Sequence, residues 1–100
     1  MTNDNLAGPL DQDELQLLVF SAKWCGPCRA SAPIFEKFSE QNPGIPVTKI
    51  DVDDNPDLVA EYGVMSVPTT IILKQGVEKT RFPWAVNVKV LENAIQEARG

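Results

Sequence analysis

Histidine is absent from this chain of 100 residues. Nucleophiles activated by a Ser-His-Asp or Cys-His arrangement, and metal sites with imidazole ligands, all need a histidine side chain. The sequence therefore excludes these classes of catalytic and metal site. Cysteine is scarce as well, since Cys25 and Cys28 are the only two. Two cysteines cannot build a zinc site of four thiolates within one chain, nor a framework of several disulfides.

Positive charge is also in short supply. The chain carries 9 Lys and Arg against 14 Asp and Glu, which gives a formal charge of −5, and no two basic residues are adjacent. A protein that binds nucleic acid or an anionic membrane usually gathers basic residues on one face to neutralise phosphates. We therefore expect neither nucleic acid nor membrane among the partners.

The N-terminus lacks the features of a secretory signal. Its first basic residue is Lys23, and no apolar segment follows a basic start. We therefore expect a cytoplasmic, reducing location. The length suits one domain, with residues 1–14 as a polar, partly irregular lead-in and residues 15–100 as the folded unit.

Hydrophobic periodicity predicts alternating strands and helices. A buried strand (15–20), a helix beginning at Pro27 and ending near Asn42, and a second strand (47–52) form a right-handed parallel βαβ unit. Asn55 is expected to cap a short helix that ends at Gly63. The rest of the chain predicts a strand (69–74), a hairpin turn (75–76), a returning strand (78–82) and a helix (87–99).

The motif Trp24-Cys25-Gly26-Pro27-Cys28 lies where the first strand ends and the first helix begins. A C-x-x-C in this position is typical of a redox-active dithiol. Free N–H groups and the dipole at a helix start favour a thiolate there, the dipole by about 0.3–1 kcal/mol. Two structural alternatives remain open at this point. A stapling disulfide across about four residues would add only about 2 kcal/mol, and half of a metal site would need ligands from a second subunit.

Several segments of the chain resemble the thioredoxin family in order and spacing, and the resemblance covers residues 15–100. It implies an α/β thioredoxin-like fold, in which helices flank a mixed sheet of four strands, or of five with a short additional strand. The segments that carry it are Phe20–Cys28, Ile50–Asp53, Tyr62–Val64, Val67–Thr69 and Gln75–Gly76.

The same resemblance implies a mechanism and a set of site residues. Cys25 would be the exposed attacking thiolate, and Cys28 would resolve the mixed disulfide formed with a client protein. Pro68 would be a cis proline facing the cysteines, with Val67 offering its backbone to the bound peptide. The residues expected to bind substrate are Trp24, Gly26, Pro27, Val67, Pro68 and Trp84.

The Gly-Pro spacer between the cysteines resembles that of the reducing members of the family, so we expect a protein-disulfide reductase. Its partners would be client proteins with disulfides and a flavin-dependent donor of the thioredoxin-reductase type. We expect a monomer with no cofactor and no metal of its own. The alternatives are a thiol oxidant or isomerase of the same fold, or a non-catalytic thioredoxin-like module that holds a partner.

Three features depart from the family pattern. Residues 1–14 are too few for the strand and helix that usually come first, which leaves the strand at 47–52 near an edge of the sheet. Val19 replaces a buried aspartate, and we interpret it as an ordinary core residue. Lys49 matches a lysine that lies near that aspartate in the family, and we interpret it as a strand residue with its ammonium in water. Trp84 replaces a groove glycine and either covers the end of the last helix or faces the substrate.

Overall fold

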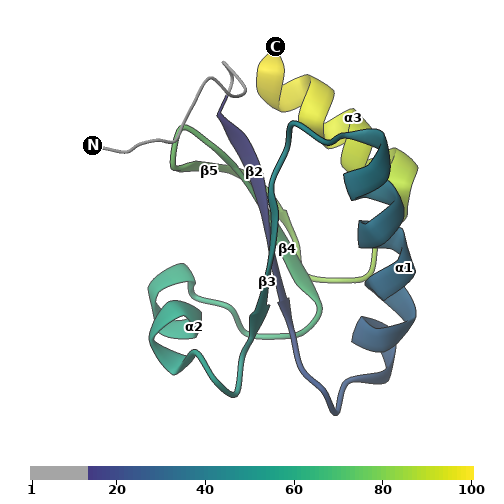
Figure 1. Ribbon diagram of the computed structural model, residues 1–100. Helices are drawn as coiled ribbons and strands as arrows, with labels where there is room; N and C mark the ends of the chain where they lie inside the picture. The colour runs from purple at the N-terminus through teal and green to yellow at the C-terminus, as the bar shows by residue number, and fades with distance from the viewer. Residues whose placement is uncertain (1–13) are drawn as a thin grey trace.

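The computed structural model describes residues 14–100 and confirms the predicted mixed sheet of four strands, in the order β3-β2-β4-β5 (Figure 1). Among the described residues β3 lies at an edge of the sheet, as expected. A further short strand in the lead-in would fall outside the described residues. The elements are β2 (Leu15–Ser21), α1 (Gly26–Gln41), β3 (Val47–Asp51), α2 (Pro56–Tyr62), β4 (Thr69–Lys74), β5 (Val77–Phe82) and α3 (Val88–Arg99).

The sheet separates two layers of helices. Strand β2 pairs in parallel with β3 and antiparallel with β4, and β4 pairs antiparallel with β5. Helices α1 and α3 cover one face, whereas α2 covers the other (Figure 1). None of the helices within residues 14–100 is long and apolar enough to cross a membrane.

Strand β2 supplies both hydrophobic cores, because successive side chains of a strand point to opposite faces. Its residues Leu15, Leu17 and Val19 belong to the core that contains Phe35 and Phe38 of α1. The residues of β2 that alternate with these, Leu18 and Phe20, belong to the core under α2. The buried members of that second core are Leu18, Phe20, Ile50, Val64, Ile71 and Leu73.

The predicted helix and hairpin ends are mostly confirmed. Gly63 closes α2 in the left-handed conformation, at φ 63°, where a residue without Cβ is favoured. Gln75 and Gly76 both have positive φ, as a two-residue hairpin turn requires. The expected cap at Asn55 is wrong in one respect. Asn55 occupies the cap position, but its side chain donates to the Asp51 carbonyl at 3.0 Å instead of accepting from the helix.

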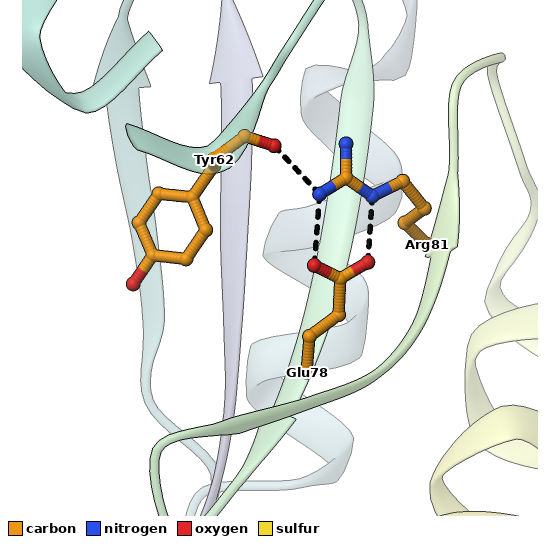
Figure 2. A network of polar contacts seen from close by, with 3 residues as sticks. All are labelled: Tyr62, Glu78 and Arg81. Carbon is orange, nitrogen blue, oxygen red and sulfur yellow. Dashed lines mark hydrogen bonds and ion pairs between the residues drawn. The ribbon is translucent and has the colours of Figure 1, made fainter. Parts of the chain in front are cut away.

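A bulge in β5 places two charged residues on the same face. Ile72 pairs with Thr80 but Leu73 pairs with Glu78, so β5 has one extra residue at this point. In a regular strand residues three apart point to opposite faces, whereas here Arg81 Nε and Nη2 donate to the Glu78 carboxylate at 2.6 and 2.8 Å (Figure 2). Arg81 Nη2 also donates to the Tyr62 carbonyl at 2.7 Å. The network thereby ties the hairpin to the end of α2.

Candidate active site

Cys25 is the N-cap residue of α1, and Cys28 lies in the first turn of that helix. The Cys25 sulfur accepts a hydrogen bond from the Cys28 backbone N–H at 3.2 Å, so one of the free donors at the helix start points at this sulfur. The two cysteines form a disulfide with their Cα atoms 5.3 Å apart. Gly26 and Pro27 fill the turn between them and are exposed.

Cys25 is not the exposed residue that the family resemblance implies. It is 5% exposed and Cys28 is 8% exposed, so the two differ little in accessibility. The physical reason is local packing, since both cysteines form a small buried cluster with Ala22, against which Val52 and Val67 pack.

The loop before β4 completes the site. The Val67–Pro68 peptide bond is cis, which confirms the expectation from the resemblance. The Cys25 sulfur lies 3.8 Å from the Val67 carbonyl oxygen, within reach of a hydrogen bond from a Cys25 thiol. The structure thus brings residues 67 and 68, which are about forty positions away in sequence, next to the cysteines.

A shallow hollow of about 220 Å³, which we call the apolar groove, adjoins this loop. None of the residues that line it carries a formal charge. They are Trp24, Val52, Val59, Val64, Met65, Ser66 and Val67. Trp24 is 67% exposed and Met65 is 96% exposed. Met65 was not predicted as a site residue, although a large apolar residue directly before Ser66-Val67-Pro68 is a usable indication.

Asp53 was missed as well. Its carboxylate accepts a hydrogen bond from Trp24 Nε1 at 3.0 Å, which holds the exposed indole beside the groove. Trp84 is placed less directly. It is 60% exposed and packs edge-on against Phe82 with 6.4 Å between ring centroids. Ser66 Oγ donates to the Pro83 carbonyl at 3.4 Å, so the segment carrying Trp84 lies next to the groove although Trp84 is not among its lining residues.

A second hollow, the basic cavity, has a volume of about 270 Å³ and lies between the sheet and the start of α1. It is bordered by Cys28 and Pro68 together with residues of β2, β3 and α1. Those residues and the adjoining loop positions are Val19, Ser21, Ala22, Lys23, Arg29, Ser31, Ala32, Phe35, Lys49 and Asp51. Val19 is 3% exposed and belongs to the hydrophobic core, as interpreted from sequence, and Lys49 is exposed.

The chemistry available at this site is thiol-disulfide exchange. Within residues 14–100 no group of three or more Cys, Asp or Glu side chains is arranged to hold a metal ion. The Cys25–Cys28 disulfide can accept two electrons and become a dithiol, with one sulfur held at a helix N-terminus.

Comparison with known proteins agrees with this geometry. The family model described as Thioredoxin matches residues 1–97. The chain is 33% identical over 99 residues to putative thioredoxin 2 of Streptomyces coelicolor, covering 99% of this chain and 74% of the relative. It is 39% identical over 87 residues to thioredoxin-1 of Saccharomyces cerevisiae, covering 83% and 84%. The crystal structure of thioredoxin NaTrxh from Nicotiana alata superposes with a TM-score of 0.81 at 36% identity, covering 88% of this chain and 76% of that one.

Proposed function

The chain belongs to the thioredoxin family of thiol-disulfide oxidoreductases, and from this premise we propose that Cys25 attacks client disulfides and Cys28 resolves the product. The observation that carries the assignment is the hydrogen bond from the Cys28 N–H to the Cys25 sulfur at the helix start. A donor and a helix dipole directed at one sulfur favour its thiolate form. Cys25 is therefore the better nucleophile of the pair near neutral pH.

The reaction transfers two electrons from the dithiol to the client. The Cys25 thiolate attacks one client sulfur, a mixed disulfide forms, and the other client sulfur leaves as a thiolate that takes a proton from water. The Cys28 thiolate then attacks the Cys25 sulfur. That step closes the Cys25–Cys28 disulfide and releases the second client thiol, so the client is reduced and the protein is oxidised.

The apolar groove is the proposed client site. Trp24 and Val67 line it, and an extended client segment would pair with the Val67 backbone beside the cysteines. Gly26 and Pro27 lie between the two cysteines in sequence, at the exposed start of α1, where a bound client would contact them. Pro68 and Trp84 contribute to the rim of the same surface.

The remaining proposals concern the cellular setting. The family implies disulfide substrates and a reductase partner, and we assign the partner to the flavin-dependent, thioredoxin-reductase type. The protein acts as a monomer in the cytoplasm, without a cofactor or metal of its own. Residues 15–100 form the catalytic domain, and residues 1–14 are a lead-in.

Dithiothreitol-driven reduction of a model disulfide protein such as insulin tests the assignment. Cys25→Ser should abolish turnover, whereas Cys28→Ser should accumulate a mixed disulfide between Cys25 and the client, detectable by mass spectrometry. Activity of Cys25→Ser close to that of the wild type would refute the assigned roles.

A further inference from the structure

The basic cavity borders the active-site disulfide but has no role in the client reaction described above. Cys28 is part of its wall, whereas Cys25 is not among the described residues that line it. We propose that this cavity is a second entrance to the disulfide, through which small anionic thiols reduce the oxidised protein by attacking Cys28. The inference rests on the proposed function only in using the same redox-active disulfide.

The sheet register creates the hollow. Val19 lies beside Lys49 and Ser21 lies beside Asp51 in the parallel pairing of β2 with β3. Neighbouring residues of paired strands point to the same face, so all four side chains lie toward α1. Ser21 is small, and Ala32 on the facing helix is small as well, so the layers leave space here. Larger side chains fill the space elsewhere under α1, as Phe38 does in the core.

The lining carries charge of the sign opposite to that of the whole chain. Lys23, Arg29 and Lys49 contribute three cations and Asp51 contributes one carboxylate, whereas the whole chain has a formal charge of −5. The lining cations are exposed, with Arg29 Nη1 donating to the Lys23 carbonyl at 3.5 Å. Part of the Asp51 carboxylate is engaged, since its Oδ1 accepts from the Asp53 N–H at 2.8 Å. The cavity therefore favours an anion.

The volume of the basic cavity is sufficient for a small molecule. About 270 Å³ lies just below the range of roughly 300–1,000 Å³ that is typical of pockets for drug-sized ligands. A thiol with a few carbon atoms and one carboxylate or sulfonate fits this space. The thiol group makes the occupant reactive toward the Cys28 sulfur in the wall.

Attack at Cys28 also expels the better leaving group. The incoming thiolate bonds to the Cys28 sulfur, the Cys25–Cys28 bond breaks, and Cys25 departs with the electron pair as a thiolate. That thiolate keeps the hydrogen bond from the Cys28 N–H at 3.2 Å, and a leaving thiol of lower pKa departs faster. A second thiol then attacks the outer sulfur and releases the small disulfide, leaving a dithiol that takes its protons from water. Two small thiols thus supply the two electrons.

Three reductants of similar size test the charge preference. Oxidised wild type is treated at about 0.01 M salt, where a Debye length of about 30 Å leaves charges about 6 Å apart nearly unscreened. The reductants are 2-mercaptoethanesulfonate, 2-mercaptoethanol and cysteamine, and free protein thiols are counted by alkylation and mass spectrometry. Rates are expressed per thiolate to remove differences in thiol pKa. One unit charge at about 6 Å in water changes a rate by about threefold, so a lining charge of +2 predicts about a tenfold preference for the sulfonate over the neutral thiol. Cysteamine should be slower than the neutral thiol.

Two matched charge variants locate the effect. Lys49→Glu leaves two cations and two carboxylates in the lining, so the sulfonate preference should fall to about onefold to twofold. Lys79→Glu makes the same change in net charge on β5, away from this cavity, and should keep the preference. A preference that both variants lose equally, or that neither loses, overturns the proposal.

Single-cysteine variants test access to Cys28 itself. In Cys25→Ser, the remaining thiol should react at least about tenfold faster with the disulfide of 2-mercaptoethanesulfonate, which carries two sulfonates, than with the neutral hydroxyethyl disulfide. In Cys28→Ser, the Cys25 thiol should show less than about a twofold preference. Equal preferences in the two variants would overturn the second entrance, while dithiothreitol-driven client reduction by the wild type reports the proposed function separately.

Discussion

The apolar groove and the basic cavity adjoin the same active-site motif but differ in chemistry. They are similar in volume, about 220 and 270 Å³, yet no residue lining the groove is charged, whereas the cavity has three cations and one carboxylate. The groove is open and bordered by an exposed tryptophan, which suits the surface of a protein. The cavity is bordered by Cys28 and suits a small anion. The charge of the lining, more than the volume, therefore decides which reductant or client each hollow accepts.

The largest expected effect comes from placing a carboxylate in the cavity wall. Val19→Asp should lower the free energy of unfolding by about 2–3 kcal/mol, because the side chain at this position is buried and a carboxylate there would lose most of its contact with water. The same carboxylate borders the cavity with Cys28, so it should accept the Cys28 proton and speed resolution of the mixed disulfide about tenfold or more near pH 7.

Single-turnover release of reduced client measures that resolution rate, and urea denaturation measures the stability. Val19→Asn is the matched control, because it brings a similar burial cost without a base. Equal resolution rates in the two variants would show that a carboxylate at this position does not act on Cys28.

Removing the Trp24 side chain should affect client reduction at the apolar groove and leave the basic cavity unchanged. Trp24→Ala should lower kcat/KM for a protein client about tenfold, equivalent to about 1.4 kcal/mol, because exposed aromatic side chains dominate protein contacts. The rate of reduction by 2-mercaptoethanesulfonate should change less than twofold. Val77→Ala removes another exposed apolar side chain, at the hairpin end, and should leave both rates unchanged. Loss of small-thiol reduction in Trp24→Ala would mean that the two hollows are one site.

A smaller effect is expected from releasing the indole of Trp24. Asp53→Ala removes the acceptor of the Trp24 Nε1 hydrogen bond, so the side chain gains rotamer freedom that binding must then restrict. We expect kcat/KM for a protein client to fall about threefold, with greater motion of the indole N–H in NMR relaxation. Asp53→Asn retains an acceptor oxygen and should restore most of the activity; failure of this rescue would point to the charge instead.

The smallest effect is expected at the Glu78–Arg81 pair, which lines neither hollow. Arg81 holds the pKa of Glu78 below its ordinary value, chiefly through their hydrogen bond (Figure 2). A lowered folded-state pKa means that the pair stabilises the fold above the unfolded pKa of about 4.3, and that this contribution is lost as the pH falls through the folded value. Glu78→Gln should cost about 0.5 kcal/mol at pH 7, since the pair is partly exposed.

Urea denaturation at pH 7 and at pH 3 measures this contribution. The difference between the variant and the wild type should shrink at pH 3, and neither the client rate nor the small-thiol rate should change. A larger difference at pH 3 than at pH 7 would contradict the assigned pKa direction.

The sequence was sufficient for the elements and for the position of the redox pair. Alternating apolar residues, Gly63 and the Gln75-Gly76 turn are local features, so each one predicts its own structure without knowledge of the rest of the chain. The cysteines were equally readable, because a C-x-x-C between a strand and a helix carries its chemistry in its spacing.

Features that depend on register or on distant contacts could not be predicted in this way. Cys25 is buried because Val52 and Val67 pack beside it, and neither residue is near it in sequence. The Glu78–Arg81 pair needs a bulge that no residue type announces. The basic cavity likewise depends on the pairing of Ser21 with Asp51, which is a property of two strands together.

The alternation along β2 makes this strand tolerant of replacement and intolerant of insertion. One apolar residue exchanged for another keeps each side chain in its own core. One added residue before Val19 would send every earlier side chain to the opposite face, or would shift the cysteines relative to Val67. Length variation should instead be accepted at the exposed Gln75-Gly76 turn, so natural relatives and engineered fusions of this protein should vary in length there and keep β2 constant.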